Sequence, residues 1–588
     1  MVAAYLLIGL AAFWPALPAL SSHIFGAEGD FVQAVWFIGW VPHALTHGLD
    51  PFWTNALNVP YGVNLAQNTA MPLVGLLLAP VTLAFGPLVV TNLLLLLAMP
   101  LSAASGFLVL RRWQVWRPAA AIGGLMYGFS PYMLGQSEGH PQFTFQPLPP
   151  LIALVTVSIL RGRGNPIRQG VGLGVLLAAE YLIAPELTAI IAVFLVAALA
   201  CAGLRRPSRI PEVARRMARP VGIALAVGTV LVACPVWLLL AGPQHVTGPP
   251  FGILNPFHND LLSFVVPGPL QRVSLGLTSL ERQVLASSNA TEAGGYIGIP
   301  LLVLGGVLAW WSRHDHRLQL ATVLMACAAI LSLGPHLAVD GRLLRVPLPF
   351  DVLDRIPVLK DILPSRVNFG VDAFFAAVIA FGLDDIRRGA SRWGRGSASA
   401  EGAVGRSARS FAAAGVILAA LVASQLPGWP YQTLPASGLP PSLARAMPGG
   451  DPVVATYPYE SYDIATMTEP MSWQASDGYG FRILSGYVYR PGANGEPTLL
   501  AQRMDPSGLQ QFLAAQGGVY TYGPRLSVSP TLMAATRATI TAYHIRAVIV
   551  DRSQNGSGPV VRLFDDTLGP PVAASGTLVM WAGWAGSG

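Results

Sequence analysis

Charged residues are scarce in this sequence. Only 11% of its 588 residues are Asp, Glu, Lys or Arg, whereas 53% are hydrophobic, and the mean hydropathy is +0.52. Soluble domains usually contain about 25% charged residues. The composition therefore argues against an ordinary soluble protein and predicts a polytopic membrane protein.

Lysine is almost absent. Lys360 is the only lysine among the 36 basic residues, and the others are arginines, a preference typical of a GC-rich bacterial genome. Lys360 lies in PVLKDIL, and no glycine-rich turn precedes it as in a phosphate-binding P-loop. The sequence therefore argues against an ATP-driven pump.

Cysteine is rare as well. Cys201, Cys234 and Cys327 lie in apolar segments, without the CxxC spacing of metal sites and redox motifs. We expect three buried free thiols and no disulfide bond.

Long hydrophobic segments, by contrast, are numerous. A membrane-spanning helix needs about 20 apolar residues. The predicted spans are residues 2–20, 89–110, 118–134, 147–161, 169–184, 186–204, 219–241, 295–311, 318–334, 366–384 and 410–426. The first of them lacks a basic region before it and contains Pro15 and Pro18, so we expect it to stay attached rather than to be cleaved as a signal peptide.

Arginine-bearing loops fix the predicted orientation. They cover residues 111–117, 161–168, 204–219, 311–317 and 384–410, and the positive-inside rule places them in the cytoplasm. An odd number of spans must then separate the first outer loop from Arg111. The apolar segment 71–86, which is short and interrupted by proline, is therefore predicted to lie in or on the outer leaflet.

This topology predicts two regions. Residues 1–426 form a helical membrane domain with outer loops at residues 21–88, 135–146, 242–294 and 335–365. Residues 427–588 are less hydrophobic and contain strand-like stretches, namely DPVVATYPY, IRAVIVDR and GTLVMWAGW. We expect them to form a soluble extracytoplasmic α/β domain.

Two carboxylates, Glu28 and Asp30, follow the first predicted span in the sequence AEGD. A carboxylate at the outer surface can act as general base towards a sugar hydroxyl. It can also hold a divalent cation such as Mg²⁺ or Mn²⁺ beside a phosphate, and these two side chains are then the candidate ligands. The alternative is that Asp30 only caps the helix that follows it.

Further polar side chains are expected at the outer surface. Glu138 and His140 lie at the mouth of two predicted spans, His258 lies in the sequence HND, and Glu292 directly precedes a span. Such groups suit hydrogen bonding to a sugar or a lipid phosphate. The alternatives are a solvated Glu–His pair and, for HND, a simple turn.

Cations are unexpectedly frequent in the outer segment 334–370. It contains Arg342, Arg345, Arg355, Lys360 and Arg366. Arg366 follows Pro364 at the mouth of a span, and we predict that it binds a lipid phosphate. The alternative is that these cations neutralise nearby aspartates.

Two glutamates lie within apolar runs of the same region. Glu180 is placed deep in a predicted span and needs a partner, because ionisable groups at that depth are costly. Glu186 follows Pro185 and is expected near the outer end of a span, where a simple interfacial position would explain it.

The layout of these motifs resembles the GT-C superfamily of integral-membrane glycosyltransferases, especially bacterial members that use polyprenyl-phosphate sugars. The resemblance rests on the outer loop that opens with GD, on MPLVGLLLAPVTLAFGP, on YGFSPYMLGQSEGH, and on LGPHL with the later PSRVNF. It covers most of residues 1–160 and 334–370. The essential acidic residue of that family corresponds to Asp30, and Glu28 matches less closely because Gly29 separates the pair.

The resemblance implies an inverting hexosyl- or pentosyltransferase in the bacterial plasma membrane. A polyprenyl-phosphate-linked sugar would be the donor, a cell-envelope glycan or glycolipid the acceptor, and Asp30 the general base. Membrane lipids are the other expected partners, and no nucleic acid is expected. The competing interpretations are a lipid or glycan transporter or flippase, and a non-catalytic membrane protein of envelope assembly.

Overall fold

The computed structural model describes residues 1–27, 29–247, 257–272, 278–285, 289–356, 359–393, 428, 431, 433–459, 461, 463–500, 508–519 and 527–584. The chain forms two compact units. The first comprises Met1–Leu17, Leu94–Leu231 and Ile253–Gln432, and the second comprises Pro18–Leu93, Val232–Gly252 and Thr433–Gly588. Glu28 and the predicted span 410–426 lie outside the described residues.

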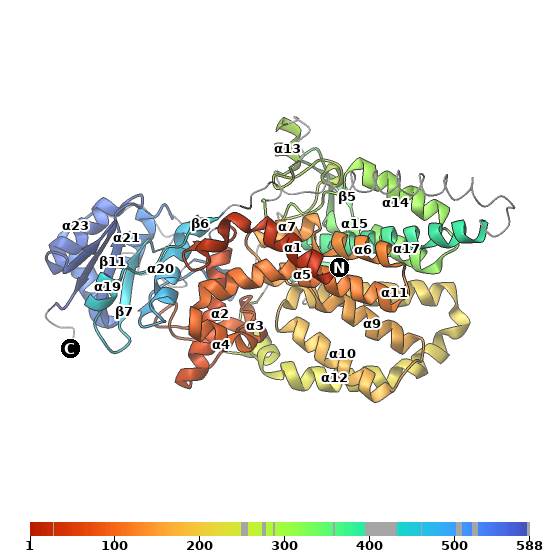
Figure 1. Ribbon diagram of the computed structural model, residues 1–588. Coiled ribbons are helices and arrows are strands. Elements are labelled where there is room, and N and C mark those ends of the chain that lie inside the picture. Colours follow the sequence, from red (N-terminus) through yellow and green to blue (C-terminus); the bar gives the residue numbers. More distant parts are fainter. Residues whose placement is uncertain are drawn as a thin grey trace. The chain divides into compact units, whose positions relative to one another are not determined.

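Helices make up most of the first unit (Figure 1). They are α1 (Val2–Ala12), α6 (Arg117–Gly128), α7 (Pro131–Ser137), α8 (Pro141–Thr144), α9 (Leu148–Leu160), α10 (Pro166–Tyr181), α11 (Pro185–Arg205), α13 (Thr278–Val284), α14 (Ile299–Trp311), α15 (His316–Ser332), α16 (Phe350–Leu353) and α17 (Asn368–Trp393). The unit also contains the hairpin of β4 (His336–Val339) and β5 (Arg342–Pro347). The boundary between the two units falls within α5 (Pro87–Arg112) and α12 (Ile210–Ala241).

Three helices of the described chain are long and apolar enough to cross a membrane: Pro87–Arg112, Pro185–Arg205 and Pro207–Ala241. They coincide with the predicted spans 89–110, 186–204 and 219–241. Four shorter apolar helices, Val2–Ala12, Leu148–Leu160, Ile299–Trp311 and His316–Ser332, lie at four other predicted spans. The total of eleven spans stays a prediction.

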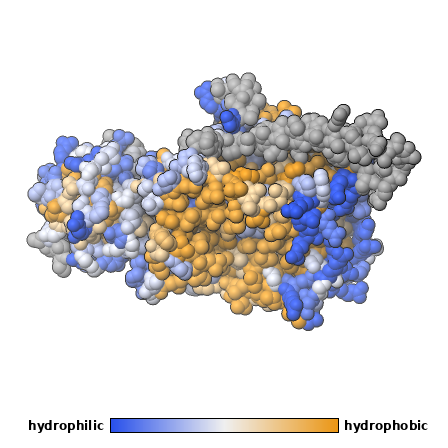
Figure 2. Space-filling model, viewed as in Figure 1, coloured by the Kyte–Doolittle hydropathy of each residue, from blue (hydrophilic) through white to orange (hydrophobic). Residues whose placement is uncertain are grey.

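Large apolar side chains are exposed on these helices. Val196 of α11 and Leu225 and Val230 of α12 are 66%, 65% and 79% exposed. Figure 2 shows that hydrophobic residues cover much of the visible helical surface. Apolar patches of this extent are typical of contact with a membrane or a partner, and the chain is a membrane protein of the helical type.

The cysteines differ from the prediction in one respect. All three are free thiols, but Cys234 is exposed and Cys201 and Cys327 are half-buried. The expectation of buried thiols was wrong because an apolar helix of a membrane protein can point its side chains outward, whereas the helices of a soluble protein turn them towards a core.

Proline and glycine shape the first helices. The predicted span 2–20 is interrupted, since α1 ends at Ala12 and a 3-10 helix over Trp14–Ala19 contains Pro15 and Pro18. Helices α5 and α6 approach closely at Gly128, where an added Cβ would come within 2.4 Å of the backbone nitrogen of Ala103. Small residues allow such close helix contacts in membrane proteins.

The second unit combines short helices with a mixed sheet. Its helices are α2 (Asp30–His47), α3 (Pro72–Leu77), α4 (Ala79–Phe85), α19 (Pro441–Ala446), α20 (Ile464–Ser476), α21 (Leu509–Gln516), α22 (Pro530–Ala542) and α23 (Ser557–Leu568). The apolar segment 71–86 therefore forms two short helices, which meet at Leu78 just before Pro80.

The sheet has five strands in the order β12-β13-β11-β7-β8. They are β7 (Val453–Tyr457), β8 (Arg482–Ile483), β11 (Ile545–Asp551), β12 (Ala573–Ser575) and β13 (Leu578–Ala582). Strands β7, β8 and β11 are parallel, whereas β13 is antiparallel to its neighbours β11 and β12. The three strand-like stretches of the sequence form β7, β11 and β13, which confirms a C-terminal α/β region.

Both faces of this sheet are covered. Along β11, Val548 and Val550 belong to an apolar core that includes residues of α21, α22 and α23, while Ala547 and Ile549 belong to another that includes residues of α2 and α20. Successive side chains of a strand point to opposite faces, so a near-continuous apolar run is expected for such a buried strand. The predicted division at residue 427 into a membrane domain and a soluble domain concerns location and stays a prediction.

Candidate functional site

The segment that carries Arg366 is fixed by backbone and amide contacts within the first unit. A 3-10 helix over Pro364–Val367 precedes α17. The Ser365 backbone N–H donates to the carbonyl of Phe257, at 3.1 Å. Asn259 and Asn368 exchange two side-chain hydrogen bonds, of 2.6 and 3.0 Å, and both residues are buried. These contacts hold Arg366 at the start of α17.

Arg366 lies between two carboxylates. Its Nη1 donates to Glu186 in the first turn of α11, and its Nε donates to Oε1 of Glu292, 3.1 Å away. The side chains of Arg366 and Glu186 are 14% exposed and that of Glu292 is 2% exposed. A guanidinium presents its donors in a fixed fork, so the two carboxylates orient it rigidly.

Glu292 accepts hydrogen bonds from three side chains. Its Oε2 accepts hydrogen bonds from the hydroxyl of Ser365 at 2.8 Å and from the amide of Gln136 at 3.3 Å. Burial alone would raise its pKa, but the charge of Arg366 and then His140 outweigh burial, and the pKa lies below its usual value. Glu292 is therefore ionised at neutral pH.

Aromatic and imidazole groups complete the cluster. His140 Nδ1 lies 3.9 Å from Oε1 of Glu292, and the ring of Phe143 lies 4.4 Å from the guanidinium carbon of Arg366. Two carboxylates and one imidazole therefore surround one guanidinium. We name these residues, Glu186, Glu292, Arg366, His140 and Phe143, the Arg366 cluster.

The Arg366 cluster retains unused donors. The Nε and Nη1 groups of Arg366 donate to the two carboxylates. No described residue accepts a hydrogen bond from its Nη2 group. The hydroxyl of Tyr132 is buried and also makes no hydrogen bond to any described residue. An oriented guanidinium with free N–H groups is suited to holding an oxyanion.

Glu138 does not join the cluster. It ends α7, and its carboxylate hydrogen-bonds with Tyr431, whose hydroxyl also contacts that of Ser137. Burial raises the pKa of Glu138, and the bond to Tyr431 opposes that rise only in part.

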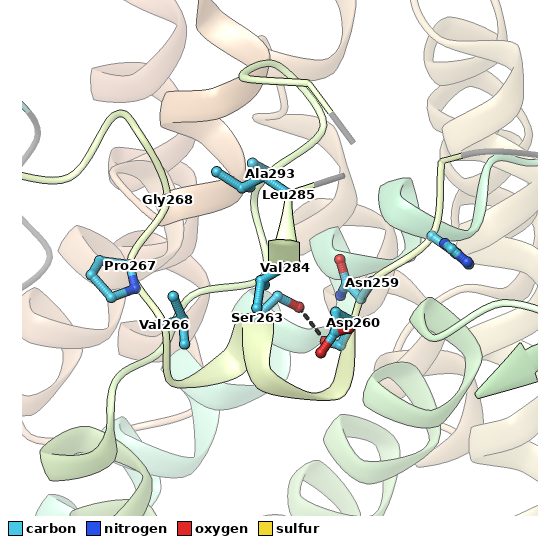
Figure 3. Close-up of a pocket in the computed structure, with 10 residues that line it drawn as sticks. Asn259, Asp260, Ser263, Val266, Pro267, Gly268, Val284, Leu285 and Ala293 are labelled. Carbon is cyan, nitrogen blue, oxygen red and sulfur yellow. Dashed lines mark hydrogen bonds between the residues drawn. The ribbon is translucent and has the colours of Figure 1, made fainter. Parts of the chain in front are cut away.

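His258 lines a separate, very small cavity of about 10 Å³, together with Asn259, Asp260 and Ser263 (Figure 3). This volume holds at most one water molecule. Asp260 caps a 3-10 helix by accepting from the Leu262 N–H at 2.8 Å and also accepts from the Gly341 N–H at 2.8 Å. The HND sequence therefore forms a turn, and its Asn259 helps to hold the segment that carries Arg366. Burial lowers the pKa of His258, and the charge of Asp260 opposes this shift only in part.

Asp30 belongs to the second unit and is the first residue of α2. The residue before the helix is Gly29, with φ +88°, so Gly29 rather than Asp30 occupies the N-cap. A carboxylate in the first turn also interacts favourably with the helix dipole. Helix α2 is anchored by Trp36, whose indole N–H donates to Gln474 at 2.6 Å and whose carbonyl accepts from the Tyr479 hydroxyl at 2.8 Å.

Sequence and structure comparisons assign the family and the fold. The family model described as "Domain of unknown function (DUF6311)" matches residues 1–358. The chain belongs to the DUF6311 family. The match contains Asp30, Glu186 and Glu292 and ends before Arg366. No curated protein matches this DUF6311 member.

Solved structures show that this DUF6311 protein has the fold of GT-C membrane glycosyltransferases, which confirms the resemblance seen in its motifs. Arabinofuranosyltransferase AftD from Mycobacteria has a TM-score of 0.58 at 16% identity, and the match covers 100% of this chain and 40% of AftD. The Archaeoglobus fulgidus oligosaccharyltransferase has a TM-score of 0.40 at 12% identity, covering 94% and 69%. ArnT from Cupriavidus metallidurans, solved with undecaprenyl phosphate, has a TM-score of 0.38 at 12% identity, covering 98% and 97%.

Two acidic residues of the DUF6311 chain were missed or undervalued in the sequence. Glu186 was assigned only an interfacial position, yet it also accepts from the Leu363 N–H at 2.8 Å. An acid at the mouth of one span and a cation at the mouth of another could have suggested the pair. Asp372 in α17 accepts from the Tyr132 N–H at 3.0 Å, and an ionisable residue inside a predicted span was the available signal.

No group of three or more His, Cys, Asp or Glu side chains in the described residues is arranged to hold a metal ion. Asp30, one of the two predicted ligands of a divalent cation, is described, and Glu28 is not. The predicted cation site stays a prediction.

Proposed function

We propose that this DUF6311 protein is an inverting membrane glycosyltransferase. It moves a pentose or hexose from a polyprenyl-phosphate donor to a glycan or glycolipid acceptor of the bacterial cell envelope. The reaction takes place at the outer face of the plasma membrane, where the predicted topology puts the Arg366 cluster, Asp30 and the C-terminal region.

One observation carries this proposal: the buried guanidinium of Arg366 is oriented by Glu186 and Glu292 and keeps unused N–H donors. Burying such a charge is costly unless it is paired, so the two carboxylates keep a cation at the mouth of a span. A lipid phosphate is an oxyanion that this cation can hold beside the membrane. The GT-C fold supports the same substrate class by analogy.

In the proposed reaction the acceptor hydroxyl oxygen attacks the anomeric carbon of the donor sugar. Asp30 takes the hydroxyl proton, a bond forms between the acceptor oxygen and the anomeric carbon, and the bond from that carbon to the phosphate oxygen breaks. Polyprenyl phosphate leaves with its bonding electrons, and Arg366 stabilises its added negative charge. Attack from the side opposite the leaving group inverts the anomeric carbon.

A divalent cation held by Asp30 and Glu28 is the alternative source of charge stabilisation for the leaving phosphate. Transfer would then require free Mg²⁺ or Mn²⁺ and would stop after treatment with a chelator. Without such a requirement, Asp30 serves as base and Arg366 as the principal cation.

The test is sugar transfer by the purified chain in nanodiscs with a set of radiolabelled polyprenyl-phosphate pentoses and hexoses, polyprenyl-phosphate arabinofuranose being the first. We expect Arg366→Gln to lower kcat/KM at least ~100-fold, the scale of losing an oxyanion donor. Arg355→Gln is the matched control, because the Arg355 side chain is 75% exposed and pairs with Asp351 at the surface.

Wild-type protein that transfers no sugar from any donor of the set, yet moves the intact lipid across a bilayer, would contradict the transferase proposal and favour a flippase. Equal activity of Arg366→Gln and Arg355→Gln would contradict the role given to Arg366.

A further inference from the structure

The second unit contains a cavity of about 690 Å³. The residues that line it have no role in the proposed reaction. One wall is a single face of α2, from Val32 to His47, and another consists of α4 and the start of α5. The remaining lining consists of residues 436–438, of α20 with Gly478 and Tyr479 after it, and of Ser21, Ser22 and Ile24. Volumes between about 300 and 1,000 Å³ are typical of small-molecule sites.

Few ionisable side chains line the cavity. The described residues that line it include no Asp, Glu, Lys or Arg. Its imidazoles belong to His43 and His47, whose rings stack 4.2 Å apart. Burial and then His47 lower the pKa of His43 to about 4, so His43 is neutral near pH 7. A phosphate or carboxylate ligand would therefore find no lysine or arginine in the described lining, and His43 would supply no charge near pH 7.

The polar wall presents acceptors rather than donors. The Ser437 hydroxyl donates to Glu469 at 3.3 Å, that of Ser476 donates to the Trp473 carbonyl at 2.8 Å, and that of Ser472 donates to the Ser437 carbonyl. Each hydroxyl has one proton and two lone pairs. The Trp473 indole N–H donates to the Ser437 oxygen at 3.1 Å and the Leu439 N–H donates to the Ser476 oxygen at 2.9 Å, so each of these two oxygens keeps one lone pair. With the protons already used, the remaining lone pairs favour a ligand whose own hydroxyl groups donate.

The opposite wall is apolar and lies next to a membrane-spanning helix. Leu83 and Phe85 of α4 line the cavity and are nonetheless 59% and 68% exposed, so they form part of its rim. Leu88 and Val89 also line it and lie in the first turn of α5, one of the candidate spans. An alkyl chain lying along these residues would leave the cavity on the side of the membrane.

We propose that this cavity binds a neutral glycolipid, with the sugar hydroxyls donating to Ser437, Ser472 and Ser476 and the alkyl chain lying along Leu83 and Phe85. The lack of lysine and arginine in the described lining, the remaining lone pairs of the serine oxygens and the apolar rim together favour this class over a phospholipid or a free sugar. The assignment concerns binding alone and does not depend on the transferase activity.

The test is photolabelling of the full-length chain in phosphatidylcholine nanodiscs with a dodecyl maltoside that carries a diazirine on its chain, followed by peptide mapping. We expect labelled peptides from α2, α4 and α20. Thr46→Trp fills the cavity from an exposed position on α2 and should lower their labelling roughly tenfold, which corresponds to about 1.4 kcal/mol. Leu45→Trp is the matched control, because Leu45 is 49% exposed on the same helix and does not line the cavity.

Ser22→Trp fills the cavity from another segment and serves if Thr46→Trp does not fold. Unlabelled dodecyl maltoside should compete for the site, whereas dodecyl phosphate should not. The proposal is overturned if neither filling variant differs from Leu45→Trp, if the label spreads evenly over the apolar helices, or if dodecyl phosphate competes as well as the maltoside.

Discussion

Arg366 and Glu292 form a buried ion pair in which Nε donates to Oε1 at 3.1 Å, although the two residues lie 74 positions apart in the chain. Glu186 occupies the other side of the same guanidinium. The pair joins a loop before α14 to the start of α17. It therefore stabilises the first unit as well as positioning the proposed phosphate ligand.

Replacing Arg366 by methionine should destabilise the protein strongly. The substitution leaves two buried carboxylates without their cation, and breaking one partner of a buried ion pair typically costs about 3–5 kcal/mol. Thermal unfolding in detergent, followed by tryptophan fluorescence, measures the effect. Arg355→Met, at the exposed pair with Asp351, should cost no more than about 1 kcal/mol. Similar losses in the two variants would show that the Arg366 cluster is not a stabilising element.

Close packing of α5 on α6 predicts a difference in stability between two glycine variants. Gly128→Ala would place a Cβ 2.4 Å from Ala103 N and 2.5 Å from Met99 O, both backbone atoms that cannot rotate away. Overpacking of this kind costs about 1–3 kcal/mol. In α10, a Cβ added at Gly172 would meet nothing within 4 Å, so Gly172→Ala is the matched control and should be neutral or slightly stabilising. Thermal unfolding of both variants checks the contact, and a Gly128→Ala variant as stable as wild type would contradict it.

Glu469 predicts how stability depends on pH. Burial, and then the nearby carboxylate of Asp551, raise the pKa of Glu469 from 4.5 to about 8. The folded state therefore binds a proton more tightly than the unfolded state, and stability falls as pH rises from about 4.5 to about 8. Glu469→Gln should remove this part of the pH dependence, so that the variant gains stability relative to wild type towards pH 8.

The measurement is the unfolding midpoint between pH 5 and pH 8.5 for wild type and Glu469→Gln. Glu212→Gln is the control, because the side chain of Glu212 is 59% exposed and pairs with Arg216 on the surface. Parallel pH profiles for wild type and Glu469→Gln would contradict the buried, protonated state of Glu469.

The secondary structure of this chain was predicted well where the residue types of a short segment determine it. Short runs rich in β-branched and aromatic residues predicted β7, β11 and β13, and a proline marked the break between α3 and α4. The interruption of the first span at Trp14–Ala19 was also available from Pro15 and Pro18, but the length criterion for a span outweighed it.

Pairing in space could not be predicted in the same way. Glu292, His140 and Arg366 were selected because each lies at the mouth of a span, and the structure brings these three together. The same criterion selected Glu138, which contacts Tyr431 instead, and undervalued Glu186. Which of several nearby charges form a pair depends on helix packing, and a single sequence does not contain that information.

In the proposed reaction the carboxylate of Asp30 activates the sugar acceptor. The most direct measurement compares sugar transfer by wild type and Asp30→Asn in nanodiscs, together with donor binding by the same two proteins. Removing a general base should lower kcat by about 10²–10⁴ while donor binding stays within about twofold. Transfer by Asp30→Asn at a rate near that of wild type would contradict the account.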